Sequence, residues 1–340
     1  MHRRVLGIDA AYTDVFIEPP ANIRQQLTRM DGDRPVFNTA PLEHIAGLFK
    51  MYPGAVTPGG TIMNTVSQIA ALGGKVSFLH ALGQDSFGTA IHDNMVARNI
   101  DEVVLPAAGL KSPVMYCLKD GEETLYRRDD GDGLSMTGAE IPDEVAQGQP
   151  IIALQMRRLL QIRPELRDKI DQMRFRHGAK LALGMQHMHR STVDENPGLL
   201  EIFEQADYVF GNRAEYEAML HTRDPWAALH HASKDAVEDG FNPTYIMTNG
   251  KHPIIVVQGG KIVATHQPAP VDAVCTVGAG DAIMGGMLYA LSRTDRDWPI
   301  DKALQLGALC AENILGIVGG QPQPKTPGHL QYLADQVLAA

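Results

Sequence analysis

Short hydrophobic runs along the chain alternate with longer segments in which apolar residues recur at helical spacing. In the second half, runs typical of strands cover residues 151–154, 180–184, 208–211 and 245–248. Helical patterns cover residues 164–177, 197–206, 214–220 and 225–238. This regular alternation predicts a right-handed parallel sheet covered by helices. Ligands of such sheets bind at the carboxyl ends of the strands.

The rest of the chain adds elements of the same two kinds. Residues 4–8 and 75–79 have the apolar composition of central strands. Residues 41–51 repeat apolar side chains at the spacing of an amphipathic helix, and helical patterns also cover residues 89–98 and 300–316. We therefore expect helices along most of the chain between the predicted strands.

A turn signal separates two further strands. The Asp-Gly dipeptide at residues 120–121 lies between residues 114–118 and 123–126, which is a strong hairpin pattern. A hairpin between strand-helix units predicts a small β element beside the main sheet. We expect this element to be built from about residues 12–36 and 103–130 and to act as a lid.

Composition limits the classes of protein to which the chain can belong. Its 340 residues are 44% hydrophobic and 21% charged, which predicts one globular domain over residues 1–340. The net charge of -10 argues against nucleic-acid and anionic-membrane binding. We see no apolar run of membrane-span length, no signal-peptide pattern and no Cys-x-x-Cys pair. A cytoplasmic setting is therefore expected.

The most informative stretch is Gly278-Ala279-Gly280-Asp281, which precedes an apolar run that can form a helix. Small residues let a ligand approach the backbone, and the first amides of a helix have no internal partner. Together they make an anion site at the positive end of a helix dipole. Asp281 in the same turn is suited to taking a proton from a hydroxyl that attacks phosphorus. Taken alone, the stretch fits equally well a helix start with glycines for tight packing.

A second glycine-rich turn, at Gly59 and Gly60, opens a helix whose first turn carries Asn64. The Asn64 amide could face a ligand there. Asp9 and Asp14 follow the first predicted strand. A carboxylate at a strand end beside a cleft can bind a ligand hydroxyl, and the alternative is a turn former or helix cap. We favour that alternative for Asp9.

Two strand-end turns in the second half carry further candidates. Asn212 and Glu215 follow the predicted strand 208–211 and share a face of the first helical turn. They could hold a hydrated Mg²⁺ or orient a phosphate. The same spacing fits an N-cap and its capping-box partner, and spacing alone favours the cap. Thr248 and Gly250 lie in a turn that fits a nucleotide contact or a plain turn equally well.

Two other groups carry weaker patterns. His187 and His189 could ligate a metal, but no third ligand is placed by the sequence, so exposed histidines in a strand-end loop are favoured. Arg127 and Arg128 precede two aspartates, which is typical of a solvated charged turn. No Walker-type loop is present in the sequence.

Three of these motifs, in their order and spacing, agree with one family. They are the turn with Gly59, Gly60 and Asn64, the segment with Gly211, Asn212 and Glu215, and the stretch from Gly278 to Asp281. Over nearly its whole length the chain resembles the ribokinase-like (PfkB) carbohydrate and nucleoside kinases. Within them it is most similar to the bacterial inosine-guanosine kinases. The resemblance implies a three-layer α/β fold, a mainly parallel central sheet with helices on both faces, and a small β lid.

The resemblance also implies roles for individual residues. Asp281 would be the catalytic base, beside an anion hole made by the amides of Gly278, Ala279 and Gly280. Binding of the acceptor substrate is implied for Asp14, Gly59, Gly60 and Asn64. Binding of the metal and phosphates is implied for Asn212 and Glu215. Contacts to ATP are implied for Thr248, Gly250 and Asn313.

The chain departs from the family pattern in three places. Many members have an aspartate six residues before the catalytic one, where this chain has Cys275. The loop that often holds a monovalent cation is therefore changed, and activation by K⁺ stays open. Ile283 replaces a common phenylalanine, and residues 122–125 of the lid lack an arginine often found near there.

The implied activity is transfer of the ATP γ-phosphoryl group, with Mg²⁺, to the 5′-hydroxyl of a purine nucleoside. Inosine or guanosine is the expected acceptor, with adenosine as a further candidate. A sugar kinase of the fructokinase or ribokinase type is the alternative, because the residues of the base pocket cannot be named from sequence. A non-catalytic ligand-binding relative is the other class, against which the intact Asp281 and its turn argue. Relatives also suggest a homodimer through the lid.

Overall fold

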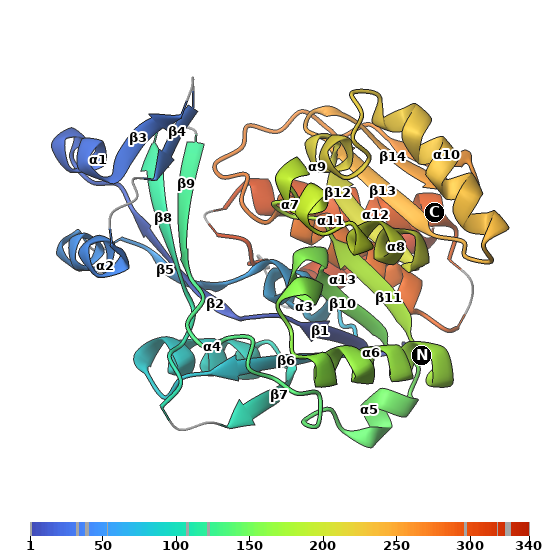
Figure 1. Cartoon of the computed structure of the whole chain (residues 1–340), viewed down its shortest axis with the longest axis horizontal. Coiled ribbons are helices and arrows are strands. Elements are labelled where there is room, and N and C mark those ends of the chain that lie inside the picture. The colour runs from blue at the N-terminus through green and yellow to red at the C-terminus, as the bar shows by residue number, and fades with distance from the viewer. Residues whose placement is uncertain are drawn as a thin grey trace.

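A nine-stranded sheet forms the centre of the computed structural model, which describes residues 2–31, 34–37, 41–52, 54–106, 109–120, 123–295, 298–317, 319–323 and 328–339. Its strands are β1 (Val5–Ile8), β6 (Val76–Leu82), β7 (Asp101–Pro106), β10 (Ile151–Gln155), β11 (Lys180–Gly184), β12 (Tyr208–Asn212), β13 (Thr244–Asn249), β14 (His252–Gln258) and β15 (Lys261–His266). They lie in the order β15-β14-β13-β12-β11-β10-β1-β6-β7 (Figure 1). Pairing is parallel from β13 to β7, and β14 and β15 are antiparallel.

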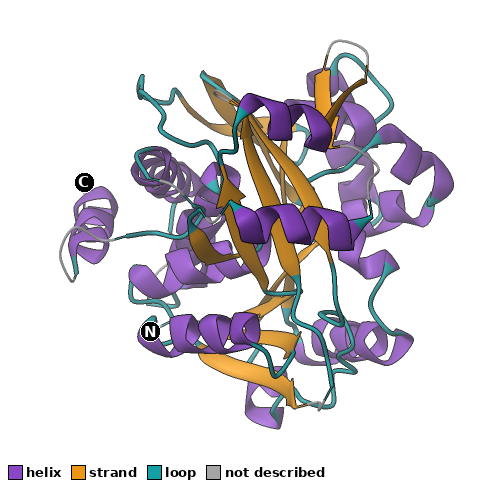
Figure 2. Ribbon diagram, turned by 90° about the vertical axis from the view of Figure 1, so that its left-hand side faces the viewer, coloured by secondary structure: helices purple, strands orange, loops and turns teal. Residues whose placement is uncertain are grey.

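Helices pack on both faces of this sheet (Figure 2). One face carries α3 (Thr61–Ala71), α4 (Ser86–Ala97), α11 (Ala279–Ser292), α12 (Ile300–Leu315) and α13 (His329–Ala339). The other face carries α5 (Asp143–Gln147), the 3₁₀ helix η1 (Met156–Leu160), α6 (Pro164–His177), α7 (Arg190–Glu195), α8 (Gly198–Gln205), α9 (Arg213–Met219) and α10 (Pro225–Glu238). The predicted three-layer α/β architecture is confirmed. Among the described residues, no helix is long and apolar enough to cross a bilayer.

The central strands are hydrophobic throughout because both faces of the sheet are buried. Successive side chains of a strand point to opposite faces. In β10, Ile151 and Ala153 therefore join the core under α3 and α11, whereas Ile152 and Leu154 join the core under α6 and α8. This double burial explains why the sequence shows continuous apolar runs in these strands rather than alternation.

Most element boundaries lie close to the predicted ones, and α6 and α10 match the predicted ranges at both ends. Helix α4 begins at Ser86, earlier than expected. Its start is set by Asp85, whose carboxylate accepts the Gly88 N–H at 2.8 Å. The polar segment after residue 20 contains α1 (Ala21–Leu27), which was not predicted. This helix is only two turns long, and its buried Leu27 gains its environment from packing rather than from sequence pattern.

A second, smaller sheet forms the lid, in the order β5-β2-β8-β9. Its strands are β2 (Tyr12–Ile17), β5 (Val56–Gly59), β8 (Val114–Asp120) and β9 (Glu123–Asp129), and a separate ribbon joins β3 (Thr28–Asp31) to β4 (Arg34–Phe37). The predicted hairpin is present, because Asp120 pairs with Glu123, although its turn at 121–122 lies outside the described residues.

The lid differs from its expected extent in two ways. Residues 103–106 belong to β7, which pairs with β6 in the large sheet. Strand β5 joins the lid although residues 56–59 lie outside the expected ranges. Helices α1 and α2 (Leu42–Met51) cover the outer face of the lid sheet (Figure 1). The homodimer through the lid and the single-domain description both stay predictions.

Two glycines set the position of α11 in the core. A Cβ at Gly285 would lie 2.8 Å from the Thr65 carbonyl oxygen of α3. A Cβ at Gly286 would lie 2.8 Å from the Gly307 Cα of α12. Only glycine permits these close approaches between helix backbones. The two contacts fix α11 against both neighbours, and its N-terminus carries Asp281.

This packing predicts opposite effects for one substitution at two helical glycines. Gly286→Ala should lower the free energy of unfolding by about 1–3 kcal/mol, because α11 and α12 must separate to admit the methyl group. Gly47→Ala in α2 should raise it by about 0.5–1 kcal/mol, because nothing lies within 4 Å of the added Cβ and alanine favours the helix. Urea denaturation of both variants measures the difference. Equal effects at the two positions would contradict the close-packed crossing.

Candidate active site

A cavity of about 280 Å³ lies between the lid and the carboxyl ends of the large-sheet strands. In the strand order, β1 has β6 on one side and β10 on the other, so the direction of winding reverses beside β1. Crevices at such a reversal are the usual ligand sites of parallel sheets. The position of the cavity therefore agrees with the position predicted from the alternating pattern.

Most of the residues predicted for the site line this cavity. They are Asp14, Gly60, Asn64, Asn212, Glu215, Thr248, Gly278, Gly280 and Asp281. Four predicted residues are not part of the lining: Gly59, Ala279, Gly250 and Asn313. Their predicted roles as direct ligand contacts therefore receive no support from the lining of the cavity.

Each of these four residues has a different local environment. Gly59 lies against Asp14, since an added Cβ would be 2.0 Å from the carboxylate Oδ2. The Ala279 N–H points to the Thr276 carbonyl oxygen at 3.4 Å. Gly250 occupies the turn between β13 and β14 with φ +56. Asn313 donates its amide to the Leu309 carbonyl oxygen within α12, at 2.9 Å.

The turn before α11 requires glycine for its shape. Gly278 is the N-cap of the helix and has φ +82, a conformation that disfavours other residues. A Cβ there would lie 2.4 Å from the Gly320 Cα, and a Cβ on Gly320 would lie 2.2 Å from the Asn64 amide nitrogen. By contrast, nothing lies within 4 Å of a Cβ at Gly280. The turn is therefore closely packed at Gly278, whereas at Gly280, in the first turn of the helix, it is open toward the cavity.

Asp281 is buried in the first turn of α11, and polar groups hold both of its oxygens. Oδ2 accepts a hydrogen bond from the Asn64 amide at 2.9 Å, and Oδ1 accepts one from the Gln186 amide at 3.3 Å. Burial raises the pKa of Asp281 to about 7, and the charges of Asp9 and Glu215 act in the same direction. A carboxylate with this pKa can accept or release a proton near neutral pH.

Asp14 faces the same cavity from the lid strand β2. Its side chain is buried, and burial together with the charge of Asp281 raises its pKa to about 8. Near neutral pH the Asp14 carboxyl group is therefore largely protonated and can donate a hydrogen bond as well as accept one. Two carboxyl groups with raised pKa values in one cavity are typical of a functional site.

Asn212 and Glu215 form the capping box that their spacing fits. The Asn212 side chain accepts the Glu215 N–H at 3.0 Å, and the Glu215 carboxylate accepts the Asn212 N–H at 2.8 Å. The other Glu215 oxygen accepts the His187 N–H at 3.1 Å. Within the described residues, no group of three or more His, Cys, Asp or Glu side chains could hold a metal ion. The metal role of the two residues stays a prediction, and it fits a hydrated Mg²⁺ better than direct ligation.

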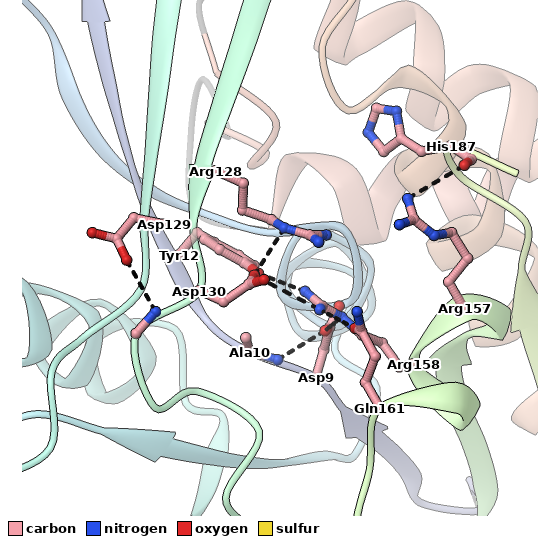
Figure 3. Close-up of polar contacts among 11 residues, drawn as sticks. Asp9, Ala10, Tyr12, Arg128, Asp129, Asp130, Arg157, Arg158, Gln161 and His187 are labelled. Atoms are coloured by element: carbon pink, nitrogen blue, oxygen red, sulfur yellow. Dashed lines mark hydrogen bonds and ion pairs between the residues drawn. The ribbon is translucent and has the colours of Figure 1, made fainter. Parts of the chain in front are cut away.

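Sequence reasoning missed a buried ion pair beside the cavity (Figure 3). Asp9 follows β1, and its Oδ1 accepts a hydrogen bond from the Arg158 Nε at 2.7 Å. Both side chains are almost completely buried, at 0% and 1% exposure. Asp9 also lies in a bend after β1, where its Oδ1 accepts the Ala10 N–H at 2.8 Å, so the ion pair adds to the predicted turn role rather than replacing it. No local pattern could have found the pair, because its members lie 149 residues apart.

This ion pair extends to the lid through Tyr12. The Tyr12 hydroxyl accepts a hydrogen bond from Arg158 Nη2 at 2.5 Å and donates one to Asp130. Asp130 also pairs with Arg128 Nε at 2.8 Å. Arg128 lines the cavity from β9, so the interpretation of this segment as a solvated charged turn is wrong for Arg128. The lid thus contributes Arg128 to the cavity, although residues 122–125 lack the arginine that is often found there in the family.

Comparison with known proteins identifies the family. Residues 54–326 match the pfkB family carbohydrate kinases. The chain belongs to the PfkB family. Members of this family are ATP-dependent phosphotransferases that act on a sugar or a nucleoside, and they typically use Mg²⁺. This PfkB kinase is therefore an enzyme of that class.

Relatives of this PfkB kinase include nucleoside kinases. It is 27% identical over 269 residues to aminoimidazole riboside kinase from Salmonella typhimurium, covering 76% of this chain and 80% of that protein. Its fold matches the adenosine kinase from Sinorhizobium meliloti with a TM-score of 0.81, at 21% identity over 100% of both chains. It also matches the Anopheles gambiae adenosine kinase with a TM-score of 0.79, at 18% identity over 94% of this chain and 98% of that one.

The buried ion pair makes this PfkB kinase sensitive to the loss of one partner. Arg158→Met should lower the free energy of unfolding by about 3–5 kcal/mol, because Asp9 is left buried without its counter-charge. Arg213→Met, which breaks an exposed pair with Glu217, should change it by no more than about 1 kcal/mol. Adding Asp9→Asn to Arg158→Met should recover much of the loss. Urea denaturation tests all three, and a small effect of Arg158→Met would contradict the pair's importance.

The raised pKa of Asp281 predicts a pH-dependent cost to stability. Between the unfolded pKa, about 4, and the folded pKa, about 7, the folded state binds the proton more tightly, so stability falls as pH rises. Asp281→Asn removes this cost. The variant should therefore gain stability relative to wild type as pH rises from about 4, by a few kcal/mol (order of magnitude) above pH 7. Thermal unfolding across this pH range measures the difference in stability between the variant and wild type. A difference that does not change with pH would contradict the prediction.

Proposed function

We propose that this PfkB kinase transfers the γ-phosphoryl group of ATP to the 5′-hydroxyl of a purine nucleoside. Inosine or guanosine is the first acceptor to test, and adenosine is the second. The observation that carries the proposal is the buried Asp281, whose pKa is raised to about 7 beside the open N-terminus of α11. A base and an anion site in one turn are the two groups that hydroxyl phosphorylation needs.

Asp281 takes the proton of the acceptor hydroxyl as that oxygen attacks phosphorus. Asn64 and Gln186 hold its two oxygens, so the carboxylate is oriented before the substrate arrives. The transferred group sits at the start of α11, where Gly280 leaves the backbone accessible and the helix dipole favours negative charge. Positioning and electrostatic stabilisation account for most of the catalysis in phosphoryl transfer.

The acceptor lies between the lid and the sheet. Asp14, Gly60 and Asn64 bind its hydroxyls, with the protonated Asp14 able to act as donor. Tyr12, Met115 and Tyr126 of the lid also line the cavity and offer apolar and aromatic surface to a base. The names of similar proteins, aminoimidazole riboside kinase and adenosine kinase, support a riboside acceptor.

ATP brings the second set of contacts. Thr248 at the end of β13 lines the cavity on the side of Asn212 and Glu215. These two residues would hold a hydrated Mg²⁺, whose positive charge would offset the charge of the phosphates. Cys275 is buried at the position where many relatives have an aspartate, and activation by K⁺ stays open.

A sugar kinase of the same family is the second candidate. The observation that favours it is the polar lining of the cavity, which includes Gln155, Gln186 and Arg128 beside the aromatic groups. A free sugar would use such groups for its remaining hydroxyls. An acceptor panel separates the two candidates.

ATP consumption should be measured with Mg²⁺ and inosine, guanosine, adenosine, cytidine, ribose or fructose as acceptor. Turnover on a purine nucleoside supports the proposal, and turnover on free sugars alone overturns its substrate claim.

Asp281→Asn tests the proposed base in the same assay. The variant should lose about 10²–10⁴ in kcat, because the acceptor proton has no base to receive it. It should unfold at no lower temperature than wild type near neutral pH. Asp301→Asn is the matched control, since Asp301 lies in the first turn of α12 outside the cavity lining, and its kcat should be unchanged. Near-normal turnover by Asp281→Asn would show that another group is the base.

A further inference from the structure

Three glycines outside the cavity lining lie directly against polar side chains that belong to it. They are Gly59 at the end of β5, Gly184 at the end of β11 and Gly320 in the segment after α12. A Cβ at these positions would lie 2.0 Å from Asp14 Oδ2, 2.2 Å from Gln186 Oε1 and 2.2 Å from Asn64 Nδ2, respectively. Among the described glycines, an added Cβ would come this close to a polar side-chain atom only at these three positions.

The backbone does not require glycine at any of the three positions. None of Gly59, Gly184 and Gly320 has a positive φ, so alanine could adopt the same conformation. Close packing of backbones does not require it either. At Gly286 an added Cβ would meet the backbone of another helix, whereas at the three positions its nearest neighbours are all atoms of one polar side chain. The space that glycine leaves is therefore used by that side chain.

Strand pairing shows how this space arises in the lid. Gly59 is the partner of Tyr12 in the register of β5 and β2. Tyr12 and Asp14 point to the same face of β2 because they lie two residues apart. A side chain at position 59 would stand on that face diagonally next to Asp14. Its absence leaves the space that the buried Asp14 carboxyl group occupies.

The other two side chains hold the proposed base. Nε2 of Gln186 and Nδ2 of Asn64 donate hydrogen bonds to the two oxygens of Asp281, at 3.3 and 2.9 Å. Within the described residues, Gln186 Oε1 and Asn64 Oδ1 are buried without a hydrogen-bond partner. Each amide thus has a free acceptor atom beside the base, to which a ligand hydroxyl can donate. The direction of both amides matters for the base and for the acceptor substrate.

Gly320 also contacts the turn before α11. A Cβ at Gly278 would lie 2.4 Å from the Gly320 Cα, while a Cβ at Gly320 would reach the amide of Asn64. The segment after α12 therefore packs against the proposed anion site and against the amide that holds Asp281. A methyl group at position 320 would displace this amide from the carboxylate.

We propose that Gly59, Gly184 and Gly320 are positioning residues of the active site, each leaving the space in which one polar side chain is held in its working direction. Gly184 and Gly320 act on the proposed base through the two amides, and Gly59 acts on the acceptor substrate through the lid carboxyl group. None of the three touches the substrate itself. The inference deepens the proposed function and rests on it.

Gly184→Ala tests the path to the base. The added methyl group meets only the end of the flexible Gln186 side chain, which can turn into the cavity, so the fold should be retained. The variant should lower kcat about 10- to 100-fold, because Asp281 loses one of the groups that orient it. The KM for ATP should be unchanged.

Gly59→Ala tests the path to the acceptor substrate. It should raise the KM for the acceptor about 10-fold and change kcat less, because Asp14 binds a hydroxyl rather than taking the reacting proton. Gly320→Ala should change both constants, since Asn64 serves the base and the acceptor. This division between KM and kcat would not arise from a general loss of packing.

Double-mutant cycles test whether each effect passes through the side chain named for it. In a Gln186→Ala background, Gly184→Ala should have no further effect on kcat, because no amide is left to displace. In an Asp14→Ala background, Gly59→Ala should have no further effect on the KM for the acceptor. Effects of equal size in both backgrounds would overturn the inference.

Gly198→Ala is the matched control. Nothing lies within 4 Å of the added Cβ, and Gly198 lies outside the cavity lining, so its kinetic constants should equal those of wild type. Thermal unfolding of every variant separates loss of fold from a displaced side chain. Severe destabilisation by all three test substitutions would show that the backbone needs glycine there, which also overturns the inference.

The outcomes separate this inference from the function on which it rests. All constants are measured with an acceptor of the panel that wild type phosphorylates. If that acceptor is a free sugar, the nucleoside claim fails, and the three glycines are still tested by the same variants. If no acceptor is phosphorylated, the proposed function and this inference fail together. Turnover on a nucleoside with unchanged constants in all three variants leaves the function standing and overturns the inference.

Discussion

The buried ion pair between Asp9 and Arg158 is the interaction on which the rest of the site depends. It joins the ends of β1 and β10, the two neighbouring strands beside which the sheet reverses its direction of winding. Through Tyr12 and Asp130 it also fixes the base of the lid. Removing both charges from water is costly unless they are paired with good geometry. The cavity is therefore bounded by this buried ion pair and its hydrogen bonds to the lid rather than by loop segments alone.

Helix packing places the turn that carries Asp281, the proposed base, within reach of the charge of Asp9. Glycines at 285 and 286 bring α11 close to α3 and α12, and Thr65 bonds the Asp281 carbonyl oxygen at 3.3 Å. The Asp281 carboxylate is then buried among Asn64 and Gln186, and burial raises its pKa toward neutrality. The same close packing that stabilises the core thus sets the proton affinity of the proposed base. Stability and activity are expected to trade against each other at this residue, because a buried carboxylate weakens the fold.

Prediction from sequence succeeded where the signal is local. The parallel sheet, its two helical layers and the lid hairpin follow from periodicity and turn residues, and the start of a helix at Gly278 to Asp281 follows from small residues before an apolar run. Prediction failed for β5 and β7, because strand partners are chosen across the whole fold. It also missed the ion pair of Asp9 and the place of Arg128 in the cavity, because their partners are distant in the chain or arranged by the lid.

The sequence by itself determined the class of fold, the order of its elements and the identity of the motifs that mark the PfkB family. Each of these depends on spacing within a short window, where side-chain direction follows from helix or strand geometry. Tertiary structure alone decided which polar groups meet, which carboxylates are buried and how far their pKa values shift. These properties depend on desolvation and on contacts between distant segments, which no local pattern encodes.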